Sequence, residues 1–163
     1  MPGKLRFAPP SPPLQVVLVE PEIPLNAGSV ARLCAATGSH LHLVGKLGFR
    51  LDAGMAKRAG VDYWDQVQVT PHEGFDAFAS LVSPSEIILF SSNASRSHLA
   101  APYRPGCALV FGRESTGLPV ELLARHRERV HAIPTVDGIR SLNLANAVAI
   151  VVYEALRVLG ALP

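Results

Sequence analysis

A glycine-bracketed loop lies between residues 109 and 119, where the apolar run Leu-Val-Phe gives way to Gly-Arg-Glu-Ser-Thr-Gly-Leu-Pro. Its two glycines, Gly112 and Gly117, have the spacing of a phosphate-binding P-loop, which continues with Lys and then Ser or Thr. Here Leu118 and Pro119 follow instead, so no lysine is placed to reach a phosphate and no hydroxyl is placed to hold Mg²⁺. The sequence therefore argues against a P-loop nucleoside triphosphatase, and the loop needs another ligand.

Three further loops share this polar, glycine- or serine-rich character and also follow short apolar runs, at 20–32, 91–98 and 134–143. Glycine lets a backbone approach a ligand closely, while Asn and Ser offer neutral hydrogen-bonding groups. We expect Arg32, Arg113 and Arg140 to meet anionic groups, because the guanidinium matches carboxylates and phosphates. In an open α/β sheet such loops gather beyond the carboxyl ends of the strands, which is where ligands bind.

Several of these residues also have a purely structural interpretation. Asn26 is a good N-cap for a helix, Ser141 could cap another helix, and Glu114 could be a surface carboxylate. Arg32 could be a solvated helix side chain. The residues taken one at a time leave both interpretations open.

Other common sites are disfavoured by what the sequence lacks. No Gly-x-Gly-x-x-Gly follows the first strand-like run, which removes the usual dinucleotide fold and the ordinary Rossmann methyltransferases. His40 and His42 are spaced i, i+2, but no Cys or carboxylate joins them, so we expect no metal site. Cys34 lies mid-helix beside Leu33, and we expect it to pack rather than to act as a nucleophile.

The elements that would position the loops alternate between strands and helices. Short β-branched runs, typical of strands buried on both faces of a parallel sheet, lie at 16–20, 41–45, 67–69, 86–90, 107–111 and 130–133. Helices are predicted from the cap Asn26 to Gly38 and at 53–60, 73–82, 119–127 and about 142–160. This alternation predicts one α/β domain with an open, mostly parallel sheet flanked by helices.

The last predicted helix, at about 142–160, is apolar on nearly every side. A helix that is apolar all round is buried all round, and the sheet of a small domain covers only one side of it. We therefore expect a homodimer in which part of this helix meets a second subunit. Val148 and Val152 are candidate partner-facing residues.

The composition predicts a globular, cytoplasmic protein. The 163 residues are 48% hydrophobic and 17% charged, and the net charge of +2 is too small to indicate nucleic acid by itself. Two cysteines make no disulfide framework, no signal peptide is visible, and the longest uncharged apolar run, Ala147–Tyr153, is too short to span a bilayer. We expect residues 1–14 to be a flexible, Pro-rich tail and 15–163 to form the domain.

Three motifs combine the loop residues: Asn26-x-Gly28-x-x-x-Arg32, then Phe111-Gly112-Arg113-Glu114-x-x-Gly117-Leu118-Pro119, then Ile133-Pro134 with Arg140-Ser141-Leu142-Asn143-Leu144-x-Asn146-Ala147. Together they resemble the SPOUT methyltransferases, which are knotted RNA-modifying enzymes that use S-adenosylmethionine. The chain is most similar to the small tRNA 2′-O-ribose methyltransferases of the wobble nucleotide (cytidine or uridine 34), with matching context at 20–24, 58–63 and 152–155. The resemblance covers about residues 16–160.

This resemblance implies an α/β fold with a C-terminal deep trefoil knot and a pocket for S-adenosylmethionine. The cofactor contacts that it implies are Phe90, Gly112, Ile133, Ser141 and Leu142. It assigns Arg32, Ser141 and Asn143 to catalysis, and Asn26, Gly28, Glu114 and Gly117 to the supporting motifs. The implied partners are tRNA and a second copy of the chain, with no membrane and no metal.

A ribose 2′-hydroxyl would attack the sulfonium methyl group in line, and its developing alkoxide needs stabilisation. We interpret Arg32 as a clamp for the alkoxide and a phosphate rather than as a base, because a guanidinium stays protonated at physiological pH. The chain departs from its relatives at Ser91-Ser92-Asn93, where Thr-Thr-Lys is usual, so a positive charge is missing. Two alternatives stay open: a related enzyme acting on another tRNA position or on ribosomal RNA, and a nonenzymatic RNA-binding protein on the same fold.

Overall fold

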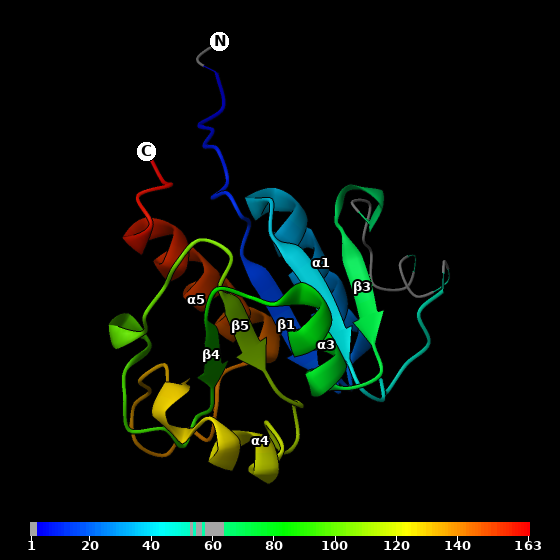
Figure 1. Cartoon of the computed structure of the whole chain (residues 1–163), viewed down its shortest axis with the longest axis vertical. Helices are drawn as coiled ribbons and strands as arrows, with labels where there is room; N and C mark the ends of the chain where they lie inside the picture. Colours follow the sequence, from blue (N-terminus) through cyan, green and yellow to red (C-terminus); the bar gives the residue numbers. More distant parts are fainter. Residues whose placement is uncertain (1–2, 53, 55–56, 58–63) are drawn as a thin grey trace.

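Six parallel strands form one sheet in the computed structural model, which describes residues 3–52, 54, 57 and 64–163 (Figure 1). The strands lie in the order β3-β2-β1-β5-β4-β6, and every neighbouring pair is parallel. Their bounds are β1 Gln15–Val19, β2 His40–Val44, β3 Val69–His72, β4 Ile87–Phe90, β5 Ala108–Phe111 and β6 Val130–His131. The predicted α/β architecture with an open parallel sheet is confirmed.

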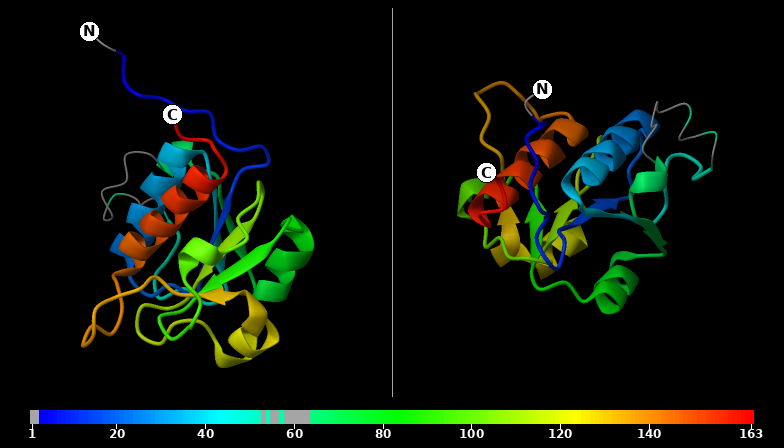
Figure 2. Two further views of the ribbon diagram at one scale, coloured as in Figure 1. Left: turned by 90° about the vertical axis from the view of Figure 1, so that its left-hand side faces the viewer. Right: turned by 90° about the horizontal axis from the view of Figure 1, so that it is seen from above.

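Helices cover both faces of this sheet (Figure 2). The helices are α1 Pro24–Thr37, α3 Phe75–Val82, α4 Val120–Arg125 and α5 Leu144–Val158, with 3-10 turns η1 Trp64–Gln66, η2 His98–Ala100 and η3 Arg127–Arg129. Helices α1 and α5 pack side by side on one face, where they meet Val16 and Leu18 of β1. Helices α3 and α4 cover the other face, where they meet Val17 and Val19. Alternate residues of one strand thus enter two separate cores, because successive side chains of a strand point to opposite faces.

The ends of α1 and α5 differ in part from the prediction. Gly38 terminates α1 as predicted, with φ 67° and its N–H bonded to the Cys34 carbonyl. The predicted N-cap is wrong, since α1 begins at Pro24 and Asn26 is buried within its first turn. The alternative role of Ser141 as a cap is also wrong, because the Asn143 side chain caps α5 by accepting from the backbone N–H three residues on.

The third strand is displaced from its predicted position at 67–69. Strand β3 spans Val69–His72 and pairs with β2 from Leu41 to Val44. Pro71 is tolerated because β3 is an edge strand, so its missing N–H removes no ladder bond. The predicted helix at 53–60 falls mostly outside the described residues, and the segment 58–63 falls wholly outside them.

Helix α5 divides into a buried face and an exposed face. Val148 and Val152 are fully buried against the sheet, so their prediction as partner-facing residues is wrong. Ile150 and Tyr153 are instead 41% and 45% exposed. The apolar surface that is left for a second subunit therefore lies one or two residues away from the predicted positions, at a different angle around the helix.

The chain after β6 runs beside the loop that follows β4. The Ala132 N–H donates to the Arg96 carbonyl at 2.7 Å, and the His98 N–H donates to the Ala132 carbonyl at 2.8 Å. These bonds hold the polar loop 91–98 against the residue that directly follows β6. The trefoil knot implied by the resemblance stays a prediction.

Part of the segment before β1 contacts the domain, since Leu14 is buried and Phe7 packs against the core under α1 and α5. The domain boundary at residue 15 stays a prediction. Within the described ranges, no helix is long and apolar enough to cross a bilayer. In the same part of the chain, no three His, Cys, Asp or Glu side chains are grouped to hold a metal ion.

Candidate functional site

A cavity of about 510 Å³ lies beyond the carboxyl ends of β4, β5 and β6. Its walls are the loops that follow these strands together with the start of α1, as expected for a ligand site in an open α/β sheet. The lining includes every residue predicted to contact the cofactor: Phe90, Gly112, Ile133, Ser141 and Leu142. The volume falls within the usual range of small-molecule sites, roughly 300–1,000 Å³.

The glycine-bracketed loop forms one wall as a tight hairpin. The Arg113 N–H donates to the Gly117 carbonyl at 3.0 Å, and the Gly117 N–H donates back to the Arg113 carbonyl at 2.9 Å. A Cβ atom added at Gly112 would lie 2.1 Å from the Gly117 carbonyl carbon and 2.2 Å from the Leu118 nitrogen. Gly112 is thus required by the closure of its own loop, and Gly117 by its φ of 74°.

The apolar part of the lining comes from the ends of two neighbouring strands. Phe90 ends β4 and Phe111 ends β5, and their rings stack with centroids 5.0 Å apart and planes 14° apart. Ile133 and Leu142, both from the chain that follows β6, add aliphatic surface. The cavity therefore combines a surface suited to a flat ring with backbone groups of the glycine loop.

Glu114 anchors the cavity wall to the start of α1. Its carboxylate accepts from the Glu22 N–H at 2.8 Å, from the Ile23 N–H at 3.1 Å and from the Asn26 amide at 3.2 Å. The carboxylate thus ties the two residues before α1 and the side chain of Asn26 to the glycine loop, and it lies near the positive end of the helix dipole. The Asn26 side-chain oxygen then accepts from the Asn143 amide at 3.1 Å, which extends the chain of bonds to the cap of α5.

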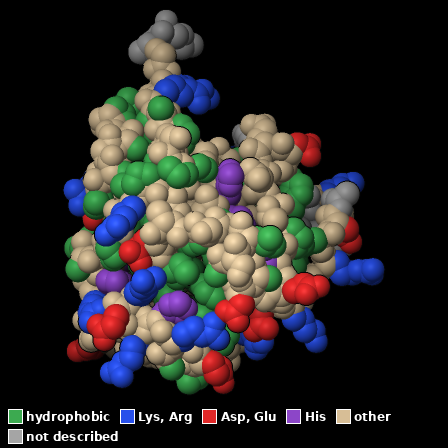
Figure 3. Space-filling model, in the orientation of Figure 1, with side chains coloured by type: hydrophobic (Ala, Val, Ile, Leu, Met, Phe, Trp, Pro, Cys, Tyr) green, Lys and Arg blue, Asp and Glu red, His purple; other side chains and the backbone are tan. Residues whose placement is uncertain are grey.

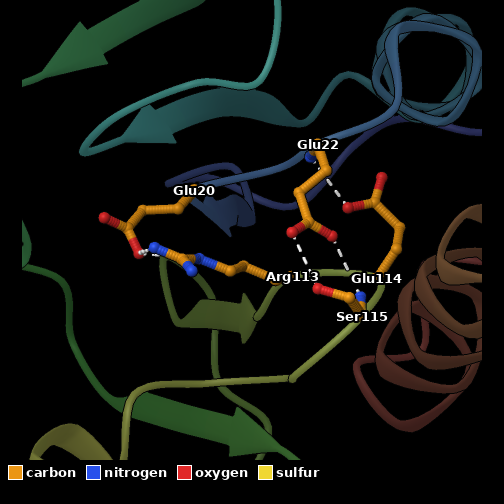
Figure 4. A network of polar contacts seen from close by, with 5 residues as sticks. All are labelled: Glu20, Glu22, Arg113, Glu114 and Ser115. Carbon is orange, nitrogen blue, oxygen red and sulfur yellow. Dashed lines mark hydrogen bonds and ion pairs between the residues drawn. The ribbon is translucent and has the colours of Figure 1, made fainter.

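Two further glutamates hold the same loop from outside (Figure 4). The Ser115 hydroxyl and N–H donate to the Glu22 carboxylate at 2.7 and 3.0 Å, and these two bonds lower the pKa of Glu22 below its usual value. Arg113 donates twice to the Glu20 carboxylate, at 3.0 and 2.5 Å. Arg140 reaches across from the 134–143 loop to donate to the Ser115 carbonyl.

Sequence reasoning did not assign Glu20 and Glu22 to the site. The signal available was the pair of carboxylates in Glu20-Pro21-Glu22, directly after β1, at the sheet edge where ligands bind. Their partners lie far away along the chain, with a sequence separation of 93. Only the fold brings the two loops into contact.

The cavity lining offers donors and positive charge rather than a proton acceptor. Its charged residues are Arg113, Glu114 and Arg140, and the oxygens of Glu114 already accept three hydrogen bonds. Within the described lining, a carboxylate placed as a general base is therefore absent. This arrangement is suited to binding an anionic or electron-rich ligand and stabilising charge that develops on it.

Arg32 lies in a second cavity, of about 630 Å³, between α1 and α5. This cavity shares two residues, Asn26 and Asn143, with the first, and the hydrogen bond between them forms part of the dividing wall. Arg32 is exposed, and Ser29 and Asn146 line the same groove. The structure therefore places Arg32 next to the predicted cofactor site but not inside it.

The chain matches the SpoU rRNA methylase family over residues 13–153. It belongs to this family. The chain is 43% identical to the tRNA (cytidine(34)-2′-O)-methyltransferase of Escherichia coli K12 over 148 residues, covering 90% of this chain and 94% of that one. It is 46% identical to a structure solved for insights into 2-OH methylation of C/U34 on tRNA, with TM-score 0.83 and coverage of 90% and 96%. An AdoMet-bound rRNA methyltransferase from Sinorhizobium meliloti is 26% identical, with TM-score 0.78, over 94% of this chain and 62% of that one.

The family predicted from the motifs is thus confirmed. Of the predicted site residues, Gly28 is buried inside α1 and lines neither cavity, and Arg32 lines only the second. The other members gather around the first cavity: Asn26, Phe90, Gly112, Glu114, Gly117, Ile133, Ser141, Leu142 and Asn143. Their individual roles in binding and catalysis stay predictions.

Proposed function

We propose that this protein transfers the methyl group of S-adenosylmethionine to the ribose 2′-hydroxyl of nucleotide 34, the wobble position of tRNA. The observation that carries the proposal is the cavity at the carboxyl ends of β4–β6, which gathers the motif residues in a chain 43% identical to an enzyme of that name. The similarity extends over 90% of the chain, so the comparison covers both the cavity and the elements that shape it.

The residues present fit S-adenosylmethionine. The stacked Phe90 and Phe111 rings and the Ile133 side chain offer apolar surface for adenine, and the tight glycine hairpin exposes backbone groups for its polar edge. Arg113 and Arg140 supply positive charge for a carboxylate at the rim. When bound there, this cofactor supplies an electrophilic methyl group. The Ser141 and Asn143 side chains at the cavity wall then orient the attacking hydroxyl.

Arg32 is proposed to stabilise the charge that develops on the 2′-oxygen and to hold a neighbouring phosphate. It lines the second cavity, which abuts the first at Asn26 and Asn143, so a nucleotide that spans this wall meets both sites. No lining carboxylate is available as a base in the described part of the first cavity, which leaves the proton to water. This agrees with the interpretation of arginine as a clamp, since its guanidinium keeps its proton.

We further propose that the protein is a homodimer built on α1 and α5 and that it acts in the cytoplasm on tRNA. The exposed apolar residues Ile150 and Tyr153 on α5 and Leu25 on α1 support a second copy as the covering partner. Contiguous exposed apolar patches, unlike single exposed apolar side chains, mark protein–protein interaction sites, and α1 and α5 pack side by side. Two unpaired, buried cysteines, Cys34 and Cys107, fit a reducing compartment.

The main alternative is methylation of ribosomal RNA or of another tRNA position on the same fold. The family as a whole is described by its rRNA methylases, and one similar structure is an rRNA methyltransferase. The higher identity of the tRNA enzymes, 43–46% against 26%, favours nucleotide 34.

The test is transfer of labelled methyl from S-adenosylmethionine to total tRNA, followed by mapping of the modified nucleotide. The proposal predicts 2′-O-methylation at position 34 and binding of S-adenosylmethionine without comparable binding of ATP in calorimetry. Labelling of ribosomal RNA alone would assign the alternative. Tight ATP binding without S-adenosylmethionine binding would refute the assignment of S-adenosylmethionine as the cofactor.

Variants of Arg32 test its role within this reaction. Arg32→Ala is expected to keep the fold and the affinity for S-adenosylmethionine but to lower single-turnover methylation at saturating tRNA by on the order of 10²–10³, the usual effect of removing one charge-stabilising donor. Arg32→Lys is expected to recover little, because a point charge does not replace the guanidinium fork. A near-wild-type rate for Arg32→Ala would remove this residue from the mechanism.

A further inference from the structure

A third hollow continues outward from the first cavity, which we call the cofactor cavity. It has a volume of about 370 Å³ and lies between the loop that follows β4 and the turn η3, bounded by Ser91, Asn93, Ser95, Arg96, Arg127 and Glu128. Ser91 and Asn93 also line the cofactor cavity, so the two hollows are contiguous. We refer to this hollow as the arginine groove.

Arg96 is held in a fixed position on one side of the arginine groove. Its guanidinium donates to the Glu128 carbonyl and, at 2.7 Å, to the Glu128 carboxylate. Its own carbonyl accepts from the Ala132 N–H at 2.7 Å, which fixes the backbone as well. A guanidinium carries five N–H donors, so this pairing leaves others available at the groove.

Arg127 supplies a second cation from a different element. It is exposed in η3, next to Glu128, and lines the arginine groove. Two arginines against one glutamate leave the lining with a net positive charge. Elsewhere on this part of the surface, basic and acidic side chains are interleaved (Figure 3), and Arg125 and Arg129 form ion pairs with Asp76 and Glu86.

The chemistry of the lining matches a sugar–phosphate backbone. The hydroxyls of Ser91 and Ser95 and the amide of Asn93 offer neutral hydrogen bonds, while the arginines offer charge for phosphates. The loop 91–93 carries no cation of its own, and the two arginines bring positive charge to that loop from the segment that follows β4 and from η3.

We propose that the arginine groove binds the RNA backbone flanking the methylated nucleotide, with Arg127 and Arg96 as phosphate contacts. This proposal rests on the proposed function for the identity of the RNA. It adds the route by which the strand leaves the cofactor cavity. Nucleotides next to the target then run along residues 91–96 toward η3.

The test compares tRNA binding by Arg127→Ala and Arg125→Ala over a series of salt concentrations, without cofactor. Arg125 is a matched control because, like Arg127, it is an exposed arginine. It ends α4, pairs with Asp76 and does not line the groove. Each phosphate contact contributes about 0.7–0.9 to the slope of log K against log salt concentration. Arg127→Ala is therefore expected to lower that slope by about 0.7–0.9 and to weaken binding roughly fivefold to tenfold at about 0.1 M salt.

The same variant is expected to raise KM for tRNA and to leave kcat and the affinity for S-adenosylmethionine unchanged. Equal slopes for Arg127→Ala, Arg125→Ala and wild type would overturn the proposal. A changed slope for Arg127→Ala with methylation found on an RNA other than tRNA nucleotide 34 would leave the groove assigned and the proposed function refuted. An unchanged slope for Arg127→Ala with methylation at nucleotide 34 would refute the groove proposal and support the proposed function.

Discussion

Replacement of Glu114 by Gln tests whether this carboxylate holds the two halves of the site together. One oxygen accepts from the Ile23 N–H and the Asn26 amide, and the other accepts from the Glu22 N–H. A glutamine has the same shape but replaces one acceptor by an NH₂ donor. In either orientation, this donor faces a donor that cannot turn away.

Asn26 cannot relieve the conflict by reversing its own amide. Its oxygen accepts from Asn143, so a reversed amide would turn a donor toward the Asn143 NH₂ group and lose that bond. In the least costly orientation, the introduced NH₂ group therefore takes the place of the oxygen that accepts from the Glu22 N–H. That charge-assisted bond is lost, and the Glu22 N–H then faces another donor. A bond to a charged group contributes about 1.5–3 kcal/mol, so we expect Glu114→Gln to lower the free energy of unfolding by about 2–4 kcal/mol.

Urea unfolding of wild type, Glu114→Gln and the control Glu73→Gln measures this difference. Glu73 is exposed, and its replacement is expected to leave the midpoint unchanged. Calorimetry at a temperature where all three are folded is expected to show weaker S-adenosylmethionine binding only for Glu114→Gln, because the glycine loop forms a cavity wall. An unfolding midpoint for Glu114→Gln that matches wild type would refute the reasoning.

Four other substitutions have expected outcomes that follow from the surroundings of each residue. Gly112→Ala forces the backbone of its hairpin apart and is expected to abolish S-adenosylmethionine binding, whereas Gly117→Ala meets no atom and costs only the left-handed conformation, about 1–2 kcal/mol in thermal unfolding. Ile150→Asp would place a charge in the proposed dimer interface and is expected to give monomers in sedimentation at low micromolar concentration; a monomeric wild type would contradict the dimer. His42 has a pKa lowered to about 4 by burial and by the nearby His72, so the unfolded chain binds the proton first and stability falls as pH drops from about 6.5 toward 4. His42→Gln is expected to reduce the fall in the free energy of unfolding between pH 7 and 5 by about 2 kcal/mol, measured by urea unfolding at each pH. An unchanged dependence of this free energy on pH would contradict the prediction.

Most of the fold could be predicted because buried parallel strands are apolar on both faces. Strands β1, β2, β4 and β5 therefore appear as short β-branched runs and were found within one or two residues. Strand β3 was misplaced because it lies at the edge of the sheet, where Thr70, Pro71 and His72 are accepted. An edge strand is only half buried, so its residues carry a weaker pattern.

The start of α1 could not be predicted, because the contacts that fix it come from elsewhere in the chain. Asn26 has the chemistry of an N-cap, yet α1 begins earlier, at Pro24, just after two backbone N–H groups that Glu114 binds, with a sequence separation of 92 at Glu22. The preference of Asn for N-cap positions thus did not decide where α1 begins, and the tertiary contacts of Glu114 formed there instead. The same contact explains why Asn26 is available to bond Asn143 and to link the two cavities.

The position of Arg32 follows from the phase of α1. Ala27, Val30, Ala31 and Cys34 face the core, so Arg32 must lie on the opposite side, in the groove with Ser29. The cofactor cavity opens at the N-terminal end of the same helix, about six residues or nine ångströms earlier along its axis, at a rise of about 1.5 Å per residue. Arg32 can therefore meet the reacting hydroxyl only through a nucleotide that crosses the Asn26–Asn143 wall, or across an interface that brings two copies of α1 and α5 together. Both routes require a site larger than the cofactor cavity of one chain, so the proposed role of Arg32 depends on bound RNA or on a second copy of the chain and not on S-adenosylmethionine alone.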